Sequence, residues 1–233
     1  MELINKIIEE FYQSIIEEAR YRYILEGLGR TVVIAFFAVI LGVIAGTLIA
    51  LIRNYHEETG KAKLANFLAK LYVTIIRGTP AVLQLMIIYY IIFKSVDVNT
   101  IIVGIIAFGL NSAAYVSEII RAGINSINKG QKEAADSLGL PYGVTMKSII
   151  LPQAIRNVLP ALGNEFITLL KETSVAGYIG IVELVKAADI IASGTYNYFF
   201  PLTIIAIIYL ILTIGLSNLL AMFEKKVLDH ARS

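Results

Sequence analysis

The sequence predicts an all-α membrane protein with about five transmembrane helices. Of its 233 residues, 57% are hydrophobic and only 16% are charged, whereas about a quarter of the residues in a soluble domain are charged. The apolar residues gather in stretches long enough to cross the roughly 30 Å hydrocarbon core of a bilayer at about 1.5 Å per helical residue. Lipid is therefore expected to be the main solvent of this chain.

Three of the five expected spans are runs without any charged residue. A fourth contains Arg77 and is interrupted by Gly78-Thr79-Pro80. The remaining span carries Glu165 and is broken by Lys171-Glu172, and it is expected to continue into a separate outer helix. In chain order the expected spans are 31–52, 71–93, 99–117, a broken span within 157–192, and 195–222.

The first 22 residues have a different pattern. Isoleucine and other apolar residues recur there at helical spacing, and glutamate, lysine and glutamine fill the opposite face. This predicts an amphipathic helix that lies on the membrane surface or packs across the spans. The segment is too charged for a signal peptide, so the chain is expected to be left uncleaved. The predicted divisions are an amphipathic helix (1–23), a transmembrane domain (24–226) with a cytoplasmic loop (128–152), and a cytoplasmic tail (227–233).

Basic residues predict the orientation of the chain. Five spans put the two ends on opposite sides of the membrane, and cytoplasmic loops carry an excess of Lys and Arg. With the C-terminus inside, 13 of the 20 basic residues lie in inner segments and 7 in outer ones. The chain is therefore expected to have its N-terminus outside, its C-terminus in the cytoplasm, and residues 121–156 on the cytoplasmic side.

Composition excludes several function classes. The chain has no Cys, which excludes disulfides, thiolate metal sites and cysteine nucleophiles. Two histidines, His56 and His230, argue against a histidine metal centre, and a net charge of +2 gives no argument for nucleic acid. The G-x4-G-K-[ST] loop that binds ATP phosphates is absent. The chain itself is therefore not expected to be an enzyme or to hold a cofactor.

The loop after the third span predicts a short helix with sharp ends. Asn128 or Gly130 can cap its start, and Glu133 in its first turn suits the helix dipole. Gly139 can adopt the left-handed conformation that ends a helix, and Pro141 prevents its continuation. The expected product is a cytoplasmic helix of two to three turns, with a small Ala134-Ala135 face that another surface can approach closely.

The residues of this loop complete a longer pattern, E-A-A-x3-G-x9-I-x-L-P. It is matched by Glu133, Ala134, Ala135, Gly139, Ile149, Leu151 and Pro152. The pattern resembles the EAA loop of the permeases of binding-protein-dependent ABC importers, which have the MetI-like fold. Three further segments look like the polar amino-acid branch of that family. These are 77–85, 159–166, and 171–174 with Ile179-Gly180.

The resemblance implies a permease with a five-helix core in the bacterial plasma membrane. It implies that Glu133, Ala134, Ala135 and Gly139 form a coupling helix that docks on a separate ATP-binding subunit, where ATP and Mg would be bound. It also implies a second permease subunit, either another copy or a paralogue, and an extracytoplasmic amino-acid-binding protein. Alternating access would then be driven by the ATP-binding subunit.

Polar groups inside the spans are candidates for binding substrate, because intramembrane polar groups usually face the bundle interior or a water-filled cavity. Glu165 is the leading candidate, since a cationic substrate would supply its counter-charge, and Thr168 follows it by one helical turn. Asn111 and Tyr115 share a face of the third span. For Glu165, pairing with Arg156 or Lys171 and a permanent proton remain open as alternatives. For Asn111, Ser112 and Tyr115, the alternative is plain interhelical hydrogen bonding. The predicted substrate-binding set is Glu165, Asn164, Thr168, Asn111, Ser112 and Tyr115.

These candidates predict an importer for a cationic amino acid (arginine, lysine or histidine), with glutamine or glutamate as the alternative. Glu118 and Arg121, three residues apart, are expected to pair with each other. Asp189 is either a guide for cations or plain surface charge. Pro80, Pro152 and Pro160 are expected near span ends as bending points or structural kinks. A secondary transporter is a remote alternative, since no inverted repeat is evident.

Overall fold

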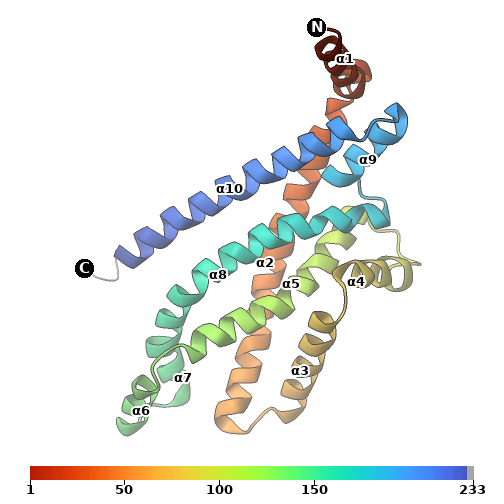
Figure 1. The fold of residues 1–233 in the computed structure, drawn as a ribbon. Coiled ribbons are helices and arrows are strands. Elements are labelled where there is room, and N and C mark those ends of the chain that lie inside the picture. Colours follow the sequence, from red (N-terminus) through yellow and green to blue (C-terminus); the bar gives the residue numbers. More distant parts are fainter. Residues whose placement is uncertain (230–233) are drawn as a thin grey trace. The chain divides into compact units, whose positions relative to one another are not determined.

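The computed structural model describes residues 1–229, and all regular secondary structure in that range is helical. It divides into two compact units. The first unit comprises Met1–Ala38, Pro80–Phe108 and Ile167–Leu216, and the second comprises Val39–Thr79, Gly109–Phe166 and Ser217–Ser233. Four long helices contribute to both units: α2 (Tyr21–Thr59), α5 (Thr100–Asn125), α8 (Leu151–Glu172) and α10 (Phe199–Asp229) (Figure 1).

The first unit contains the N-terminal elements and the segment between α8 and α10. Its core is formed by apolar residues of η1, α2, α9 and α10, among them Ile15, Ile24, Leu184 and Ile205. Besides its parts of the long helices, it contains α1 (Glu2–Phe11), η1 (Tyr12–Ile16), η2 (Glu17–Ala19), α4 (Ala81–Ile87), η3 (Ile88–Ile92), η5 (Thr173–Ile179) and α9 (Leu184–Thr195).

The amphipathic segment expected over residues 1–22 is helical, but it is not one helix. Its regular part ends in the π-helical turn η1, and Glu18 and Ala19 have positive φ angles of 53° and 55°. L-residues rarely adopt this conformation, so the chain changes direction there before α2 begins. Along α1, Ile4, Ile7 and Ile8 are exposed, which leaves its apolar face free for lipid or for a partner.

The second unit contains the short helices around the predicted cytoplasmic loop. Figure 1 shows α6 (Lys129–Ser137) and α7 (Tyr142–Thr145) where α5 ends and α8 begins, with the π-helical turn η4 (Met146–Ile150) leading into α8. Its core joins Ala50 of α2 and Val116, Ile120 and Ile124 of α5 to Met146 and Ile150 of η4. The remaining helix of this unit is α3 (Lys63–Gly78).

Glycines allow α2 and α5 to pack closely in the second unit. A Cβ atom on Gly42 would lie 2.7 Å from the Ser112 hydroxyl, and one on Gly46 would lie 2.7 Å from the Ala113 carbonyl oxygen. Small residues at such positions let helix backbones approach each other in membranes. The two glycines therefore set how deeply Ser112 is buried.

In the part of the chain that the structure describes, three helices are long and apolar enough to cross a membrane: α2, α5 and Phe199–Lys225 of α10. Lys63–Gly78 and Ala81–Ile92 also qualify together, as a pair bent by 112°, which would make four. The bend lies at the predicted break, where extended Thr79 precedes Pro80, because proline disfavours helical backbone in the residue before it. The polar α8 is not among the candidates, so the count of five spans stays a prediction.

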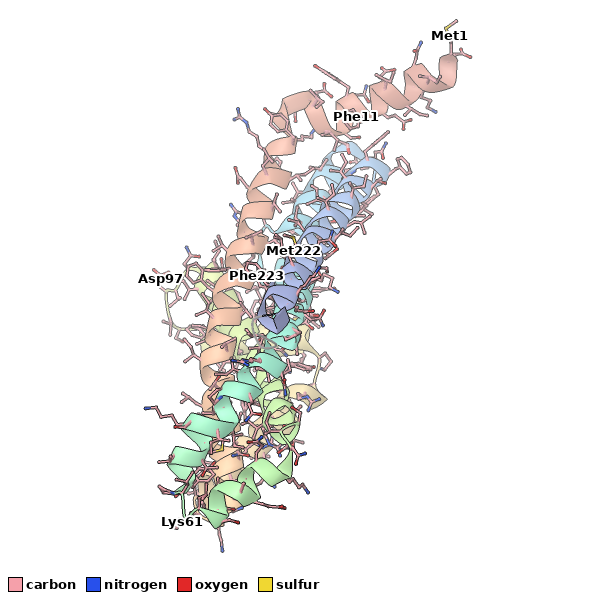
Figure 2. All side chains as sticks on the ribbon, turned by 90° about the vertical axis from the view of Figure 1, so that its left-hand side faces the viewer. Met1, Phe11, Lys61, Asp97, Met222 and Phe223 are labelled. Carbon is pink, nitrogen blue, oxygen red and sulfur yellow. The ribbon has the colours of Figure 1, made fainter. Side chains whose placement is uncertain are left out.

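The two other prolines do not interrupt their helix. Pro152 is the second residue of α8, directly after the π-helical turn η4, and α8 continues through Pro160 to Glu172. Among the three single-helix candidates, α10 is the least covered, since only 11% of its apolar window is buried. Figure 2 shows Met222 and Phe223 near its C-terminal end, with exposed fractions of 68% and 66%.

Candidate functional site: a buried carboxylate, an arginine network and a capped loop helix

Two of the six predicted substrate-binding residues are in direct contact in the second unit. The Ser112 hydroxyl of α5 donates a hydrogen bond of 2.9 Å to the Glu165 carboxylate of α8. Ser112 is fully buried and Glu165 is partly buried. Among the side chains that the structure describes, up to Lys225, Glu165 makes no ion pair, so the alternative pairing with Arg156 or Lys171 is not observed. The carboxylate is therefore held by a neutral donor and is without a counter-charge from the described chain.

The other predicted residues are placed differently. Asn111 is buried, with an exposed fraction of 4%, and Tyr115 is half-buried. The Arg77 guanidinium lies 5.5 Å from the centre of the Tyr115 ring, within the range of a cation–π interaction. Asn164 is exposed, and Thr168 belongs to the first unit. The contact between Ser112 and Glu165 is thus directly observed within the predicted set.

One helical turn beyond Tyr115, Glu118 is the centre of a charge network. Arg121 approaches its carboxylate at 3.4 Å and Arg77 at 4.0 Å, and Arg53 also forms an ion pair with it. Arg121 extends the network to Glu57, at 2.6 Å. The predicted pairing of Glu118 with Arg121 is confirmed, but Arg53 and Arg77 were missed. A basic residue inside or directly after an apolar run needs a partner, and this signal could have identified both.

The predicted loop helix is confirmed as α6, with the expected signals at both ends. The Asn128 side chain accepts a hydrogen bond of 2.8 Å from the Gly130 N–H. At the other end Gly139 has a φ of +69°. The N–H of Leu140 bonds to the carbonyl of Ala135, and that of Gly139 to the carbonyl of Asp136. These two bonds form a Schellman motif, which satisfies carbonyls that the helix end would leave free.

The sides of α6 differ in exposure. Ala135 is buried, with an exposed fraction of 1%, and Lys132 pairs with Glu58 of α2. Glu133 and Ala134 are exposed. Leu138 at the tip has an exposed fraction of 78%. The helix is thus anchored through one side and presents a small, partly acidic face with an apolar tip, and Leu138 is a part of this surface that sequence reasoning missed.

Polar contacts brace the loop beside α6. Asn54 of α2 donates a hydrogen bond of 2.9 Å to the Tyr142 hydroxyl, and burial raises the pKa of Tyr142 above its ordinary value. A cavity of about 580 Å³ lies between α6 and this brace, with Lys129, Lys132 and Asp136 in its lining. The Asn54–Tyr142 hydrogen bond connects the C-terminal part of α2 to the chain just after the Schellman motif. A displacement of α6 would therefore also shift the C-terminal part of α2.

A second buried carboxylate lies in the first unit, and sequence reasoning missed it. Glu183 has an exposed fraction of 0% and caps α9 by accepting hydrogen bonds of 2.7 Å from the N–H groups of Val185 and Lys186. Burial raises its pKa to about 7. Glutamate is not among the residues preferred at an N-cap, so no local signal in the sequence identified this role.

The segment that carries Glu183 is fixed to the N-terminal part of α2. A Cβ atom on Gly27 would lie 2.9 Å from the Glu183 backbone. Arg30 donates to the Val182 carbonyl at 3.2 Å, and the Leu184 N–H donates to the Thr31 hydroxyl at 3.3 Å. Asp189, considered as a guide for cations, pairs with Lys186 at 2.8 Å. Within the described residues, no group of three or more His, Asp and Glu could hold a metal.

Comparison with known proteins places the chain in a family. The family model for the binding-protein-dependent transport system inner membrane component matches residues 38–229. A putative glutamine transport system permease protein of Rickettsia typhi, GlnP, is 43% identical over 96% of this chain and 98% of its own length. The arginine transport system permease protein ArtQ of Bacillus subtilis is 42% identical over 88% and 92%.

Solved structures share the fold. The crystal structure of an amino acid ABC transporter with histidines contains a chain that is 42% identical, with a TM-score of 0.81 over 91% of this chain and 97% of that one. An inward-facing structure of the MetNI methionine ABC transporter has a TM-score of 0.73 at 18% identity, over 92% and 98%, and supports the fold alone. With its EAA loop, its capped α6 and these matches, the chain belongs to the family of inner membrane components of binding-protein-dependent transport systems.

Proposed function

We propose that this chain is the permease of an ABC importer for a polar amino acid, and that Glu165 binds the cationic part of the substrate. The observation that carries this proposal is the bond between Ser112 and Glu165. A partly buried carboxylate without a counter-charge is unfavourable by several kcal/mol. An ammonium or guanidinium group that enters the site offsets this cost, so the site favours a cation.

The hydrogen bond from Ser112 has a specific role in this site. It occupies one oxygen of Glu165 and fixes the orientation of the carboxylate, and the second oxygen remains available to the substrate. A neutral amide such as that of glutamine can use the same site if Glu165 is protonated, because the protonated acid can donate a hydrogen bond. Glutamine is thus the second candidate substrate.

The relatives support an amino acid but do not choose between these candidates. ArtQ is named for arginine, GlnP for glutamine, and the solved transporter contains histidines, all at 42% or 43% identity. The Glu165 carboxylate, which has no counter-charge among the described side chains, supports arginine, lysine or histidine, since each carries a cationic side chain or can acquire one.

The exposed face of α6 is the proposed docking surface for an ATP-binding subunit. It combines the acidic Glu133, the small Ala134, which admits close approach, and the exposed Leu138. Ala135 belongs to the same motif but is buried, so it acts by anchoring the helix. Gly139 sets the abrupt end of the helix. In this proposal α6 and the C-terminus lie in the cytoplasm and the N-terminus lies outside.

The remaining partners follow from the family. We propose a second permease subunit, either another copy or a paralogue, and an extracytoplasmic protein that delivers the amino acid. ATP binding would move the docked α6, and the Asn54–Tyr142 contact would pass that motion to α2. The charge network around Glu118 joins α2, α3 and α5 and would make these helices move together.

Reconstitution tests the substrate assignment. The chain is placed in proteoliposomes with its ATP-binding subunit and the binding protein encoded with it, and ATP hydrolysis is measured with each of the common amino acids. Stimulation by arginine, lysine or histidine above that by glutamine supports the cationic assignment. Stimulation by glutamine alone contradicts it, and stimulation by no amino acid contradicts the amino-acid importer itself.

A further inference from the structure

An apolar cavity of about 450 Å³ lies between α8 and the C-terminal end of α10 in the second unit. It has no role in the proposed transport mechanism. The two helices touch at one side of it, where a Cβ atom on Gly163 would lie 2.3 Å from the Leu220 side chain. Its apolar lining is formed by Val39, Leu159, Pro160, Leu162, Gly163, Phe166, Leu220 and Phe223.

Two residues of opposite charge complete the lining of this cavity, Arg156 from α8 and Glu224 from α10. Among the side chains that the structure describes, which end at Lys225, neither forms an ion pair with the other or with any other residue. Arg156 is exposed and Glu224 is half-buried. One cavity thus presents a cation, an anion and an apolar interior, and both charges are available to a ligand.

The position of these charges along the helix matches the boundary of a membrane. Glu224 comes near the end of the candidate span Phe199–Lys225, directly after the exposed Phe223. Charged residues at the ends of spans usually lie at the depth of the lipid headgroups. A molecule that enters the cavity from the bilayer would therefore bring its headgroup to Arg156 and Glu224 and its hydrocarbon to the apolar lining.

We propose that this cavity binds a zwitterionic phospholipid with a primary ammonium, of the phosphatidylethanolamine class. One acyl chain lies against Leu159, Phe166 and Phe223. The phosphate accepts hydrogen bonds from Arg156, whose planar guanidinium suits a phosphate, and the ammonium donates to Glu224. A phospholipid with a net negative headgroup satisfies Arg156 but leaves Glu224 facing an anion. The pair of charges therefore selects for the zwitterion.

Native mass spectrometry of the full chain with its ATP-binding subunit tests this binding. Phosphatidylethanolamine and phosphatidylglycerol with identical acyl chains are added in equal amounts in a mild detergent. We expect phosphatidylethanolamine to be retained about two- to fivefold more than phosphatidylglycerol, because partly exposed ion pairs contribute only about 1 kcal/mol or less to binding. Equal retention, or a preference for phosphatidylglycerol, overturns the proposal, and this comparison requires no variant to fold.

Variants then locate the site. Arg156→Gln and Glu224→Gln should each reduce the retained phosphatidylethanolamine, and Glu224→Gln should also remove the preference over phosphatidylglycerol. Leu159→Trp should reduce both lipids by filling the cavity while it leaves both charges in place. Lys70→Gln is the matched control, because Lys70 is an exposed basic residue of the same unit outside the cavity lining. If Lys70→Gln reduces the retained phosphatidylethanolamine as much as Arg156→Gln does, the lipid does not bind in this cavity.

A second copy of the chain is the competing occupant of this surface. Since the chain contains no Cys, Phe223→Cys introduces a single thiol at the mouth of the cavity. Labelling by a maleimide attached to a lipid supports the proposal. Efficient crosslinking of this thiol to a second permease subunit shows that protein covers the cavity and overturns the lipid assignment.

Discussion

The Ser112 hydroxyl of α5 lies 2.9 Å from the Glu165 carboxylate of α8, and it is the polar contact that brings the two predicted site segments together. The residues are 53 positions apart in the chain. Their contact depends on Gly42 of α2, which leaves just enough room for the buried Ser112. A small residue on a third helix thus helps to position the carboxylate that we propose as the substrate ligand.

Replacement of Glu165 should affect transport more than ATP hydrolysis. Glu165→Gln retains the size and the hydrogen bond of the side chain but removes its charge. A hydrogen bond to a charged group contributes about 1.5–3 kcal/mol, so uptake of arginine or lysine should fall by about tenfold or more. Uptake and hydrolysis are measured in the same proteoliposomes, and the number of amino acids moved per ATP should fall.

The matched control for this prediction is Glu9→Gln, which removes an exposed carboxylate of α1. Ser112→Ala should give a smaller decrease than Glu165→Gln, because it frees the orientation of the carboxylate without removing its charge. Unchanged uptake of a cationic amino acid in Glu165→Gln would show that Glu165 is not the ligand.

The end of α6 should be sensitive to any side chain at position 139. Gly139 has a φ of +69°, and an ordinary L-residue in that conformation costs about 1–2 kcal/mol. Gly139→Val should therefore distort the Schellman motif and separate ATP hydrolysis from uptake. Gly139→Asn is the control, since asparagine tolerates the left-handed conformation. Normal coupling in the valine variant would count against the docking role of this helix.

Removal of the Glu118 carboxylate should destabilise the protein more than removal of the Glu57 carboxylate, which belongs to the same charge network. Glu118→Gln leaves Arg53, with an exposed fraction of 8%, without its counter-charge, which costs about 3 kcal/mol in a buried pair. Thermal unfolding of the purified protein measures the effect. Glu57→Gln, which affects a more exposed carboxylate of the same network, should cost much less. Equal losses would mean that Arg53 does not depend on Glu118.

Glu183 should make stability depend on pH. Burial raises its pKa from 4.5 to about 7 in the folded protein, so the folded state binds a proton that the unfolded state releases in this interval. The resulting stabilisation is fully present below about pH 4.5 and is lost as the pH rises through about 7. The unfolding temperature of the wild type should therefore fall over this interval.

Glu183→Gln isolates this contribution, because the amide imitates the protonated acid and does not titrate. The fall in unfolding temperature across neutral pH should be smaller in this variant than in the wild type. Asp189→Asn, which changes a more exposed carboxylate of the same helix, should leave the pH dependence unchanged. Parallel curves for the wild type and Glu183→Gln would contradict the assignment.

Labelling tests the proposed orientation. Gln131 is exposed on α6, and Gln131→Cys supplies the only thiol of the chain. A maleimide that cannot cross membranes should label it only when the cytoplasmic side is accessible. Asn5→Cys on α1 should show the opposite behaviour. Labelling of position 131 from outside would show that α6 lies on the outer side of the membrane, where an ATP-binding subunit could not dock on it.

Local features of this protein follow directly from its sequence. The cap at Asn128, the left-handed Gly139 and the helix between them depend on neighbouring residues, and the structure contains all three. The same holds for the bend at Gly78-Thr79-Pro80, because proline acts on the residue beside it. The EAA pattern and the apolar stretches were likewise sufficient to identify the family.

Tertiary structure alone decides which distant groups meet. Arg53 and Glu118 are 65 positions apart, and nothing local in either segment identifies the other as its partner. Glu183 is buried because Gly27 admits its backbone against α2, whereas the sequence around it is that of an ordinary helix start. Such contacts depend on the rotation and the separation of packed helices, which small residues at the interface set. For this reason the sequence identified Glu165 as a candidate, and the structure showed that Ser112 is the residue that holds it.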